Sequence, residues 1–362
     1  MKLRVSIFLL NTLLLIIIPS IKSSQNKHKN WIVITSINSP TKAVKQLAKL
    51  PDWHTVVVAD KKTPQDWSYP NAELLTIEKQ LLLNYRITKL LPWNHYTRKN
   101  IGYLYAIQNG AQVIYDTDDD NFLIQNRIDV LPASGTYSQL NTKNSTCNIY
   151  AYFGQPTVWP RGYPLEKIVQ PEKETTISTH IRPLIQQGLV NGDPDVDAIF
   201  RLTRNLNFNF SNKPEALTLP KNTLCPFNSQ STLFHYDAFW GLLIPMATPF
   251  RVCDIWRGYF SQRLLWDIDG TLCFVRPQAI QERNMHNYHK DFIDEIMLYT
   301  DAGKLVELLR TWQSNSPKLS DRMLELTNTL IKNKFYKSAE LNLMQAWIAD
   351  LNDIGYKFPK II

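Results

Sequence analysis

The sequence predicts an α/β protein with a parallel, nucleotide-binding type of sheet and a C-terminal helical appendage. Short apolar runs alternate with helical segments in the first third of the chain, and helical periodicity alone continues from about residue 290 to the end. With 362 residues, of which 44% are hydrophobic, the chain suits two domains or one domain with a large appendage.

The N-terminal segment, residues 1–24, has the pattern of a signal peptide or a signal anchor. Lys2 and Arg4 precede an apolar run from Val5 to Ile18, which is shorter than the roughly 20 residues that span a bilayer. Either interpretation directs the remainder into the secretory pathway, with residues 25–30 as a polar stem. A cleaved segment would leave a secreted or endoplasmic reticulum protein, whereas an uncleaved one would anchor the protein in the membrane.

Two further features bear on the compartment. Two sequons for N-glycosylation fit a lumenal chain, and four cysteines allow either two disulfides, in three pairings, or four buried thiols. The sequons are Asn144-Ser145-Thr146 and Asn209-Phe210-Ser211, and the cysteines are Cys147, Cys225, Cys253 and Cys273.

The formal charge of +8 suits an anionic ligand such as a nucleotide diphosphate, or an anionic surface. The chain has no dense stripe of lysine and arginine with interleaved aromatic residues, so we expect no nucleic-acid partner.

The first third of the chain predicts a βαβ unit. Residues 31–37 and 54–60 are apolar and β-branched, as buried strands are, and a helix over residues 41–50 separates them. A third apolar segment, residues 72–78, precedes helices over residues 78–91 and 95–109. No GxGxxG motif follows the first strand, which disfavours a dinucleotide.

The next strand leads into an acidic run. Ala111 to Asp120 reads AQVIYDTDDD, an apolar stretch that ends in four carboxylates. Mg²⁺ or Mn²⁺ would relieve the repulsion between these acids and bridge them to a diphosphate at the carboxyl end of the sheet. We therefore expect Asp116, Asp118 and Asp120 as metal ligands; the alternative is a solvated acidic turn.

Three other residues are candidates for contacts with a bound nucleotide. Asp60 ends its strand and could hold the nucleoside, while Arg98 and Lys99, one helix before the acidic run, could contact a diphosphate. Asp116 is expected to touch the ribose. The alternative is that Arg98 and Lys99 are ordinary solvated charges without a role at the site.

The middle of the chain is less regular. Residues 150–190 contain five prolines and predict an ordered, irregular connection, after which residues 192–204 offer a second set of acids leading into a helix, Asp193, Asp195 and Asp197. Asp193 is a candidate N-cap of that helix. Short apolar segments within residues 225–245 predict a second small sheet beside the first.

A further charged helix follows over residues 250–270. Asp254 at its start is a candidate general base, with Arg257 nearby to keep the carboxylate charged; the alternative is an N-capping aspartate on an amphipathic helix. His286 and His289 are candidate metal ligands, although an exposed histidine needs no such role.

Ten segments in this order resemble the STELLO family, a group of Golgi glycosyltransferases named from plants. The resemblance covers about residues 30–362. The segments are WIVITSI, KTPQDW, EKQ, RKNIGYLYAIQNGA, YDTDDD, DVDAIFRLT, FNSQSTLF, AFWGLLIP, DIWRGYFSQRLLWDIDG and AWIADLNDIGY.

The resemblance implies a glycosyltransferase-A-like domain with a Rossmann-like, nucleotide-sugar-binding sheet over residues 31–290. Its donor half would cover residues 31–125 and its acceptor half residues 150–290, with a helical region over residues 291–362. It also implies a type II Golgi membrane protein and, in plants, a link to cellulose synthase assembly. The family's DxD motif falls on Asp116 and Asp118, with Asp119 as the next acid; Asp120 replaces a basic residue of the plant motif.

The leading hypothesis is a lumenal glycosyltransferase that uses Mn²⁺ or Mg²⁺, a UDP- or GDP-sugar and a glycan acceptor. Asp254 would be the base of an inverting reaction, with Asp195 or Asp197 in reserve; a retaining enzyme would use the same acids differently. One alternative is an inactive Golgi protein that scaffolds other enzymes. A metal-dependent phosphohydrolase is disfavoured because the sequence has no second dense set of metal ligands.

Overall fold

A computed structural model describes residues 28–169, 174–204, 208–282 and 287–362. The expected signal segment, residues 1–24, and His286 lie outside the described residues. Within these ranges, no helix is both long enough and apolar enough to cross a membrane.

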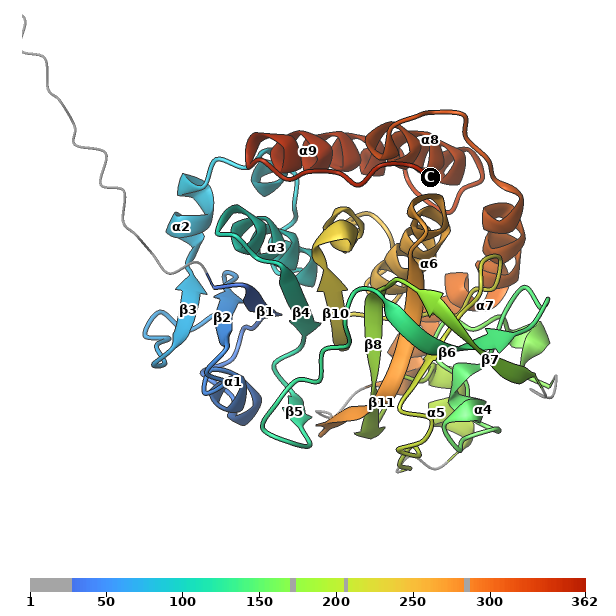
Figure 1. The fold of residues 1–362 in the computed structure, drawn as a ribbon. Coiled ribbons are helices and arrows are strands. Elements are labelled where there is room, and N and C mark those ends of the chain that lie inside the picture. The colour runs from blue at the N-terminus through green and yellow to red at the C-terminus, as the bar shows by residue number, and fades with distance from the viewer. Residues whose placement is uncertain (1–27, 170–173, 205–207, 283–286) are drawn as a thin grey trace, which may run out of the picture.

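The described strands form one mixed sheet that runs through the molecule (Figure 1). The four strands at one end are parallel, and the sheet becomes mixed where β10 pairs antiparallel with β4 and with β8. The spatial order is β3 (Ala72–Leu75), β2 (Trp53–Val58), β1 (Asn30–Thr35), β4 (Val113–Thr117), β10 (Ser231–His235), β8 (Pro183–Gly192), β11 (Thr271–Gln281), β9 (Ala216–Thr218), β6 (Gly135–Asn141) and β7 (Thr175–Ile181), with β5 (Asn121–Leu123) paired to β11.

Helices cover both faces of the parallel strands because the side chains of each strand alternate. Ile32 and Ile34 of β1 pack with Val44 and Leu47 of α1 on one face, whereas Val33 packs toward α3 on the other. Strands buried on both faces read as continuous apolar runs, which is why the sequence predicted them. The helices are α1 (Lys42–Leu47), α2 (Ile77–Leu82), α3 (Lys99–Gln108), α4 (Ile149–Tyr152), α5 (Ala198–Thr203), α6 (Cys253–Leu265), α7 (Tyr288–Thr311), α8 (Leu319–Lys332) and α9 (Ala339–Asp353).

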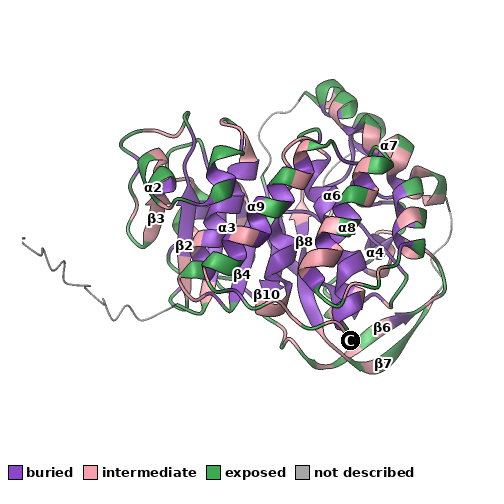
Figure 2. Cartoon of the chain, turned by 90° about the horizontal axis from the view of Figure 1, so that it is seen from above, coloured by how far each residue is buried: buried purple, intermediate pink, exposed green. Residues whose placement is uncertain are grey.

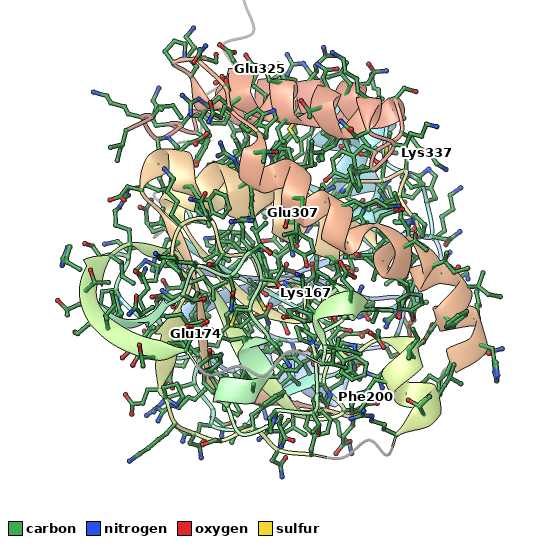
Figure 3. The ribbon with its side chains drawn as sticks, turned by 90° about the vertical axis from the view of Figure 1, so that its right-hand side faces the viewer. Lys167, Glu174, Phe200, Glu307, Glu325 and Lys337 are labelled. Carbon is green, nitrogen blue, oxygen red and sulfur yellow. The ribbon has the colours of Figure 1, made fainter. Side chains whose placement is uncertain are left out.

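The C-terminal helices are part of the core. Trp347 of α9 is fully buried and its indole N–H donates to the carbonyl of Trp240 over 3.0 Å. Asp350 of α9 accepts from the backbone N–H of Arg86 and Ile87. Figure 2 shows that α8 and α9 carry both buried and exposed residues, and Figure 3 shows Glu307 of α7 and Glu325 of α8, both exposed, on the outer side. The buried residues of this region therefore belong to the same hydrophobic core as those of the strands.

Three sequence predictions about local structure are wrong. Residues 150–190 were expected to be irregular, yet β8 lies near the middle of the sheet. The strand was missed because two of its buried residues, Gln186 and Gln187, are polar. β10 belongs to the same sheet, so there is no second small sheet among the described strands. The helix expected over residues 78–91 ends at Leu82, because Asn84 adopts a positive φ of 55°.

Candidate active site

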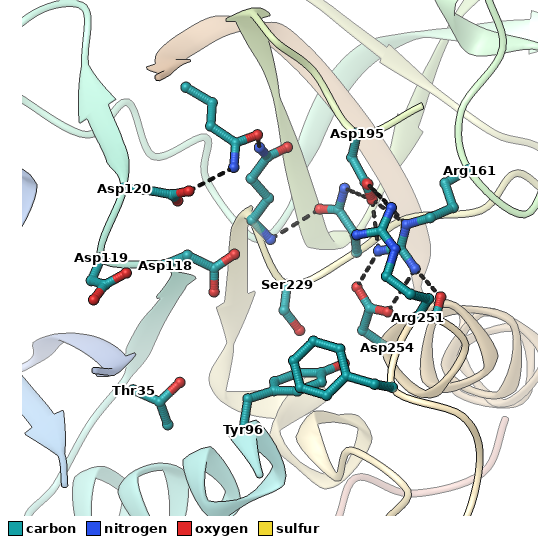
Figure 4. A pocket seen from close by; sticks show the side chains of 14 residues that line it. Thr35, Tyr96, Asp118, Asp119, Asp120, Arg161, Asp195, Ser229, Arg251 and Asp254 are labelled. Carbon is teal, nitrogen blue, oxygen red and sulfur yellow. Dashed lines mark hydrogen bonds and ion pairs between the residues drawn. The ribbon is translucent and has the colours of Figure 1, made fainter. Parts of the chain in front are cut away.

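A cavity of about 250 Å³ lies at the ends of β4 and β11 and beside the start of α6 (Figure 4). Five carboxylates and two guanidinium groups line it. A second cavity of about 210 Å³ opens beside it at the ends of β1 and β2, and the two share Thr35, Tyr96, Asp119 and Phe250. The site thus has two adjoining chambers at the carboxyl ends of parallel strands, where ligands bind in open α/β sheets.

Asp116 precedes the acids of the first cavity in the chain but is not among the residues that line it. It is the fourth residue of β4, fully buried, and was expected to contact the ribose and the metal. Its carboxylate instead pairs with Lys99 Nζ at 2.8 Å and with Arg257 Nη2 at 3.2 Å. A carboxylate without exposed surface and with two cationic partners supports the floor of the cavity, and Lys99, equally buried, does so too.

The next three acids reach the cavity itself. The side chain of Asp118 is 42% exposed and lies 3.1 Å from Lys99 Nζ. Asp119 accepts hydrogen bonds from Ser36 and Asn38 of the loop after β1, and Asp120 accepts from Gln281 of β11 over 2.9 Å. The loop after β4 is therefore tied to both neighbouring parts of the sheet.

Loss of hydration at the cavity floor, with Asp120 and Asp116 close by, raises the pKa of Asp118 to about 7, against the opposing effect of Lys99. Because the Asp118 side chain is partly exposed, solvent screening weakens this upward shift of its pKa. A cation beside Asp118 would favour its charged form.

An arginine that joins two carboxylates forms the opposite wall. Arg161 Nη2 lies 2.7 Å from Asp195 Oδ2 and 2.9 Å from Asp254 Oδ2. Asn228 also donates to Asp195 over 2.8 Å, whereas the hydrogen bonds identified to the Asp254 carboxylate come from Arg161. Arg251 pairs with the buried Glu295 of α7 at 2.7 Å.

Between the two groups of acids, the wall is made of neutral amides. Gln281 links Asp120 to Gln230: its side-chain Nε2 donates to Asp120, and its side-chain Oε1 accepts from Gln230 Nε2 over 2.5 Å. The backbone N–H of Gln230 donates to Asn228, which in turn reaches Asp195. A continuous hydrogen-bonded chain therefore crosses the cavity wall (Figure 4).

The second cavity contains the remaining candidates for nucleotide contacts. Asp60 lies two residues after β2 and holds the loop at His95 by accepting its backbone N–H over 3.1 Å. Arg98 lies at 3.6 Å over the ring of Trp93, and burial lowers its pKa to about 10. Both residues line this cavity.

Two expected site residues lie elsewhere. Asp197 caps α5 by accepting from Phe200 N and also accepts from Trp159, and burial raises its pKa to about 6. Asp193, the expected cap, pairs with Arg201 instead. His289 is exposed in the first turn of α7. Neither Asp197 nor His289 is among the residues that line the first cavity. Arg257 was expected beside Asp254, but it pairs with Asp116. Arg161 pairs with Asp254 instead.

Three parts of the site were not predicted from the sequence: Arg161, Arg251 and the amide wall formed by Asn228, Gln230 and Gln281. Arg161 lies in the proline-rich connection and carries no local signal. The triplet of Asn228, Ser229 and Gln230 stands directly before the apolar strand β10, a pattern that could have been recognised. The four cysteines are buried thiols, which agrees with the second of the two alternatives.

The sheet, its terminal helices and the acid-lined cavity define a glycosyltransferase-A-like α/β protein. Residues 251–362 match the model of the STELLO glycosyltransferases. The chain is also 33% identical, over 92% of its length, to two Arabidopsis thaliana proteins named "Probable glycosyltransferase STELLO1" and "Probable glycosyltransferase STELLO2". These matches confirm the resemblance to the STELLO family. The chain spans 46% of the length of each of these relatives.

Proposed function

We propose that this chain is a metal-dependent glycosyltransferase that moves a sugar from a nucleotide-sugar to a hydroxyl group of a glycan or glycoconjugate. One observation carries the proposal: the acids Asp118 to Asp120 and the pair Asp195 and Asp254 face one cavity that adjoins a nucleoside-sized chamber. The glycosyltransferase names of the matched family and relatives support the same class of reaction.

A divalent cation is proposed on Asp118 and Asp120. The described residues contain no preformed group of three or more His, Cys, Asp or Glu side chains that could hold a metal, so donor phosphate and water would complete the shell, as is usual for Mg²⁺. The cavity is lined by five carboxylates and two arginines, an excess of negative charge that a dianionic diphosphate could enter only with a counterion. When bound, Mn²⁺ or Mg²⁺ supplies Lewis-acid stabilisation of the departing diphosphate.

For the base, Asp254 is preferred to Asp195. Arg161 binds both carboxylates, but Asp195 also accepts from Asn228 and so has less remaining capacity to take a proton. In the proposed inverting step, the acceptor hydroxyl oxygen bonds to the anomeric carbon while its proton passes to Asp254. The bond from that carbon to the diphosphate oxygen breaks, and its electron pair leaves with the nucleoside diphosphate.

The proposed location is the Golgi lumen, as the resemblance to the STELLO family implies. Residues 1–24 are proposed as the membrane anchor because they have the pattern of a signal peptide or a signal anchor. The same pattern leaves cleavage and secretion as an outcome that N-terminal sequencing of the mature protein would identify.

The test is calorimetric binding of UDP, GDP and their sugars to the full-length chain in detergent, with and without Mn²⁺. We expect saturable, Mn²⁺-dependent binding that Asp118→Ala abolishes and that Asp52→Ala, which removes an exposed acid, leaves intact. If the folded wild-type chain binds neither nucleotide, the transferase proposal fails and the scaffold alternative replaces it.

A further inference from the structure

Resting on the proposed function, we propose that the transferred sugar is neutral, a hexose or pentose without a carboxylate, and that Gln230 and Gln281 bind its hydroxyl groups. The inference comes from the charge balance of the cavity and from the chemistry of the wall between its two acidic groups.

Each basic side chain at the cavity is already matched by carboxylates. Arg161 is shared between Asp195 and Asp254, and Arg251 lies 2.7 Å from Glu295. Lys99 and Arg257, beneath the floor, are matched by Asp116 and Asp118. Within the described residues that line this cavity, no lysine or arginine is left to pair with a carboxylate on the sugar.

The remaining charge is negative. Asp119 is held by neutral donors, Ser36 and Asn38, and three carboxylates, Asp195, Asp254 and Glu295, share Arg161 and Arg251. A divalent cation offsets two of these charges but also brings in a dianionic diphosphate. A sugar carboxylate would therefore enter a field of its own sign, at low hydration, where like-charge repulsion is strong.

The amide wall suits hydroxyl groups. Gln230 and Gln281 are 5% and 7% exposed, and their amides are fixed by the chain that joins Asp120 to Asp195. Amide groups both donate and accept, as sugar hydroxyls do, and buried polar groups that are held in place discriminate strongly against a ligand that leaves them unpaired.

The test compares matched pairs of donors on the full-length chain with Mn²⁺: UDP-glucose with UDP-glucuronate, UDP-galactose with UDP-galacturonate, and GDP-mannose with GDP-mannuronate. Each pair differs only in a hydroxymethyl or carboxylate group at C6. For the nucleotide that binds, we expect each acidic sugar to have a Kd at least about tenfold higher than its neutral partner, and a uronate that binds as tightly as its partner would overturn the inference.

Charge-insertion variants make the test specific to this wall. Gln281→Lys, or Gln230→Lys if the first variant is not folded, should narrow the gap within each pair, whereas Gln112→Lys adds the same charge at an exposed site outside the cavity and should not. An unchanged gap in both folded wall variants would place the sugar elsewhere and overturn the assignment. If a nucleotide binds but its neutral and acidic sugars bind equally well, this inference alone is refuted. If no nucleotide binds, both this inference and the proposed function are refuted.

Discussion

Arg257 Nη2 lies 3.2 Å from Asp116 Oδ2, joining α6 to β4 across 141 residues of sequence in a buried ion pair. Lys99 of α3 closes the group from the other side of the same carboxylate. Asp116 is thereby a structural anchor for three elements, and the acids that follow it, Asp118 to Asp120, are held at the cavity by that anchor.

Replacing Asp116 with Asn should destabilise the fold because Lys99 and Arg257 would remain buried without their shared carboxylate. Breaking a buried ion pair by removing one partner costs about 3–5 kcal/mol. Urea denaturation of Asp116→Asn, with the exposed Asp52→Asn as control, measures this change. A variant of unchanged stability that loses nucleotide binding would instead make Asp116 a ligand residue.

Replacing Arg161 should abolish most of the proposed sugar transfer, even by a substitution that keeps the positive charge. Lysine is a point charge and cannot match two carboxylates as the planar guanidinium does, so Arg161→Lys should lower kcat/KM by about a hundredfold or more, through misplacement of Asp254. Donor binding measured in the same samples should change little, because Asp118 and Asp120, the proposed metal ligands, lie across the cavity from Arg161. A variant with full activity would refute the positioning role.

The C-terminal helices should be inseparable from the sheet. Trp347 is fully buried and donates to the carbonyl of Trp240, so Trp347→Ala should lower the free energy of unfolding by about 3–5 kcal/mol, with a smaller loss for Trp347→Phe. Circular dichroism of a chain truncated after residue 290 provides the complementary measurement. A truncated chain that folds cooperatively would show that the helices are an independent appendage.

Stability should fall as pH rises from about 4.5 to 7 because of Glu340 on α9. This residue is 3% exposed and accepts from Met246 N and Ala247 N, and burial raises its pKa to about 7. Since the folded state binds the proton more tightly than the unfolded chain, whose ordinary pKa is 4.5, folding is progressively disfavoured from about pH 4.5 to pH 7.

The full effect of this one group approaches about 3 kcal/mol, by the relation of roughly 1.4 kcal/mol per pKa unit. Urea denaturation between pH 5 and about pH 8 should show a shallower decline for Glu340→Gln than for wild type. An identical decline in both would assign the pH dependence to other groups, such as Asp197, whose raised pKa acts in the same direction at lower pH.

Much of this protein can be predicted from local sequence. Apolar runs identified β1, β2 and β4, and the acids that follow β2 and β4 placed Asp60 and Asp118 at the carboxyl edge of the sheet. Asp254 was correctly expected at the start of a helix. These predictions succeed because a strand buried on both faces, or a helix buried on one, must repeat its apolar residues with the period of its backbone.

Only the tertiary structure decided which charged groups meet. β8 carries two buried glutamines and so lacks the apolar period of a central strand, and Arg161 reaches Asp195 and Asp254 from a connection with no period at all. Local sequence likewise did not reveal that Asp116 would be covered by Arg257 while Asp118 stayed open to the cavity. Ion pairs between distant residues depend on how whole elements pack, and that packing is set by the burial of the entire core.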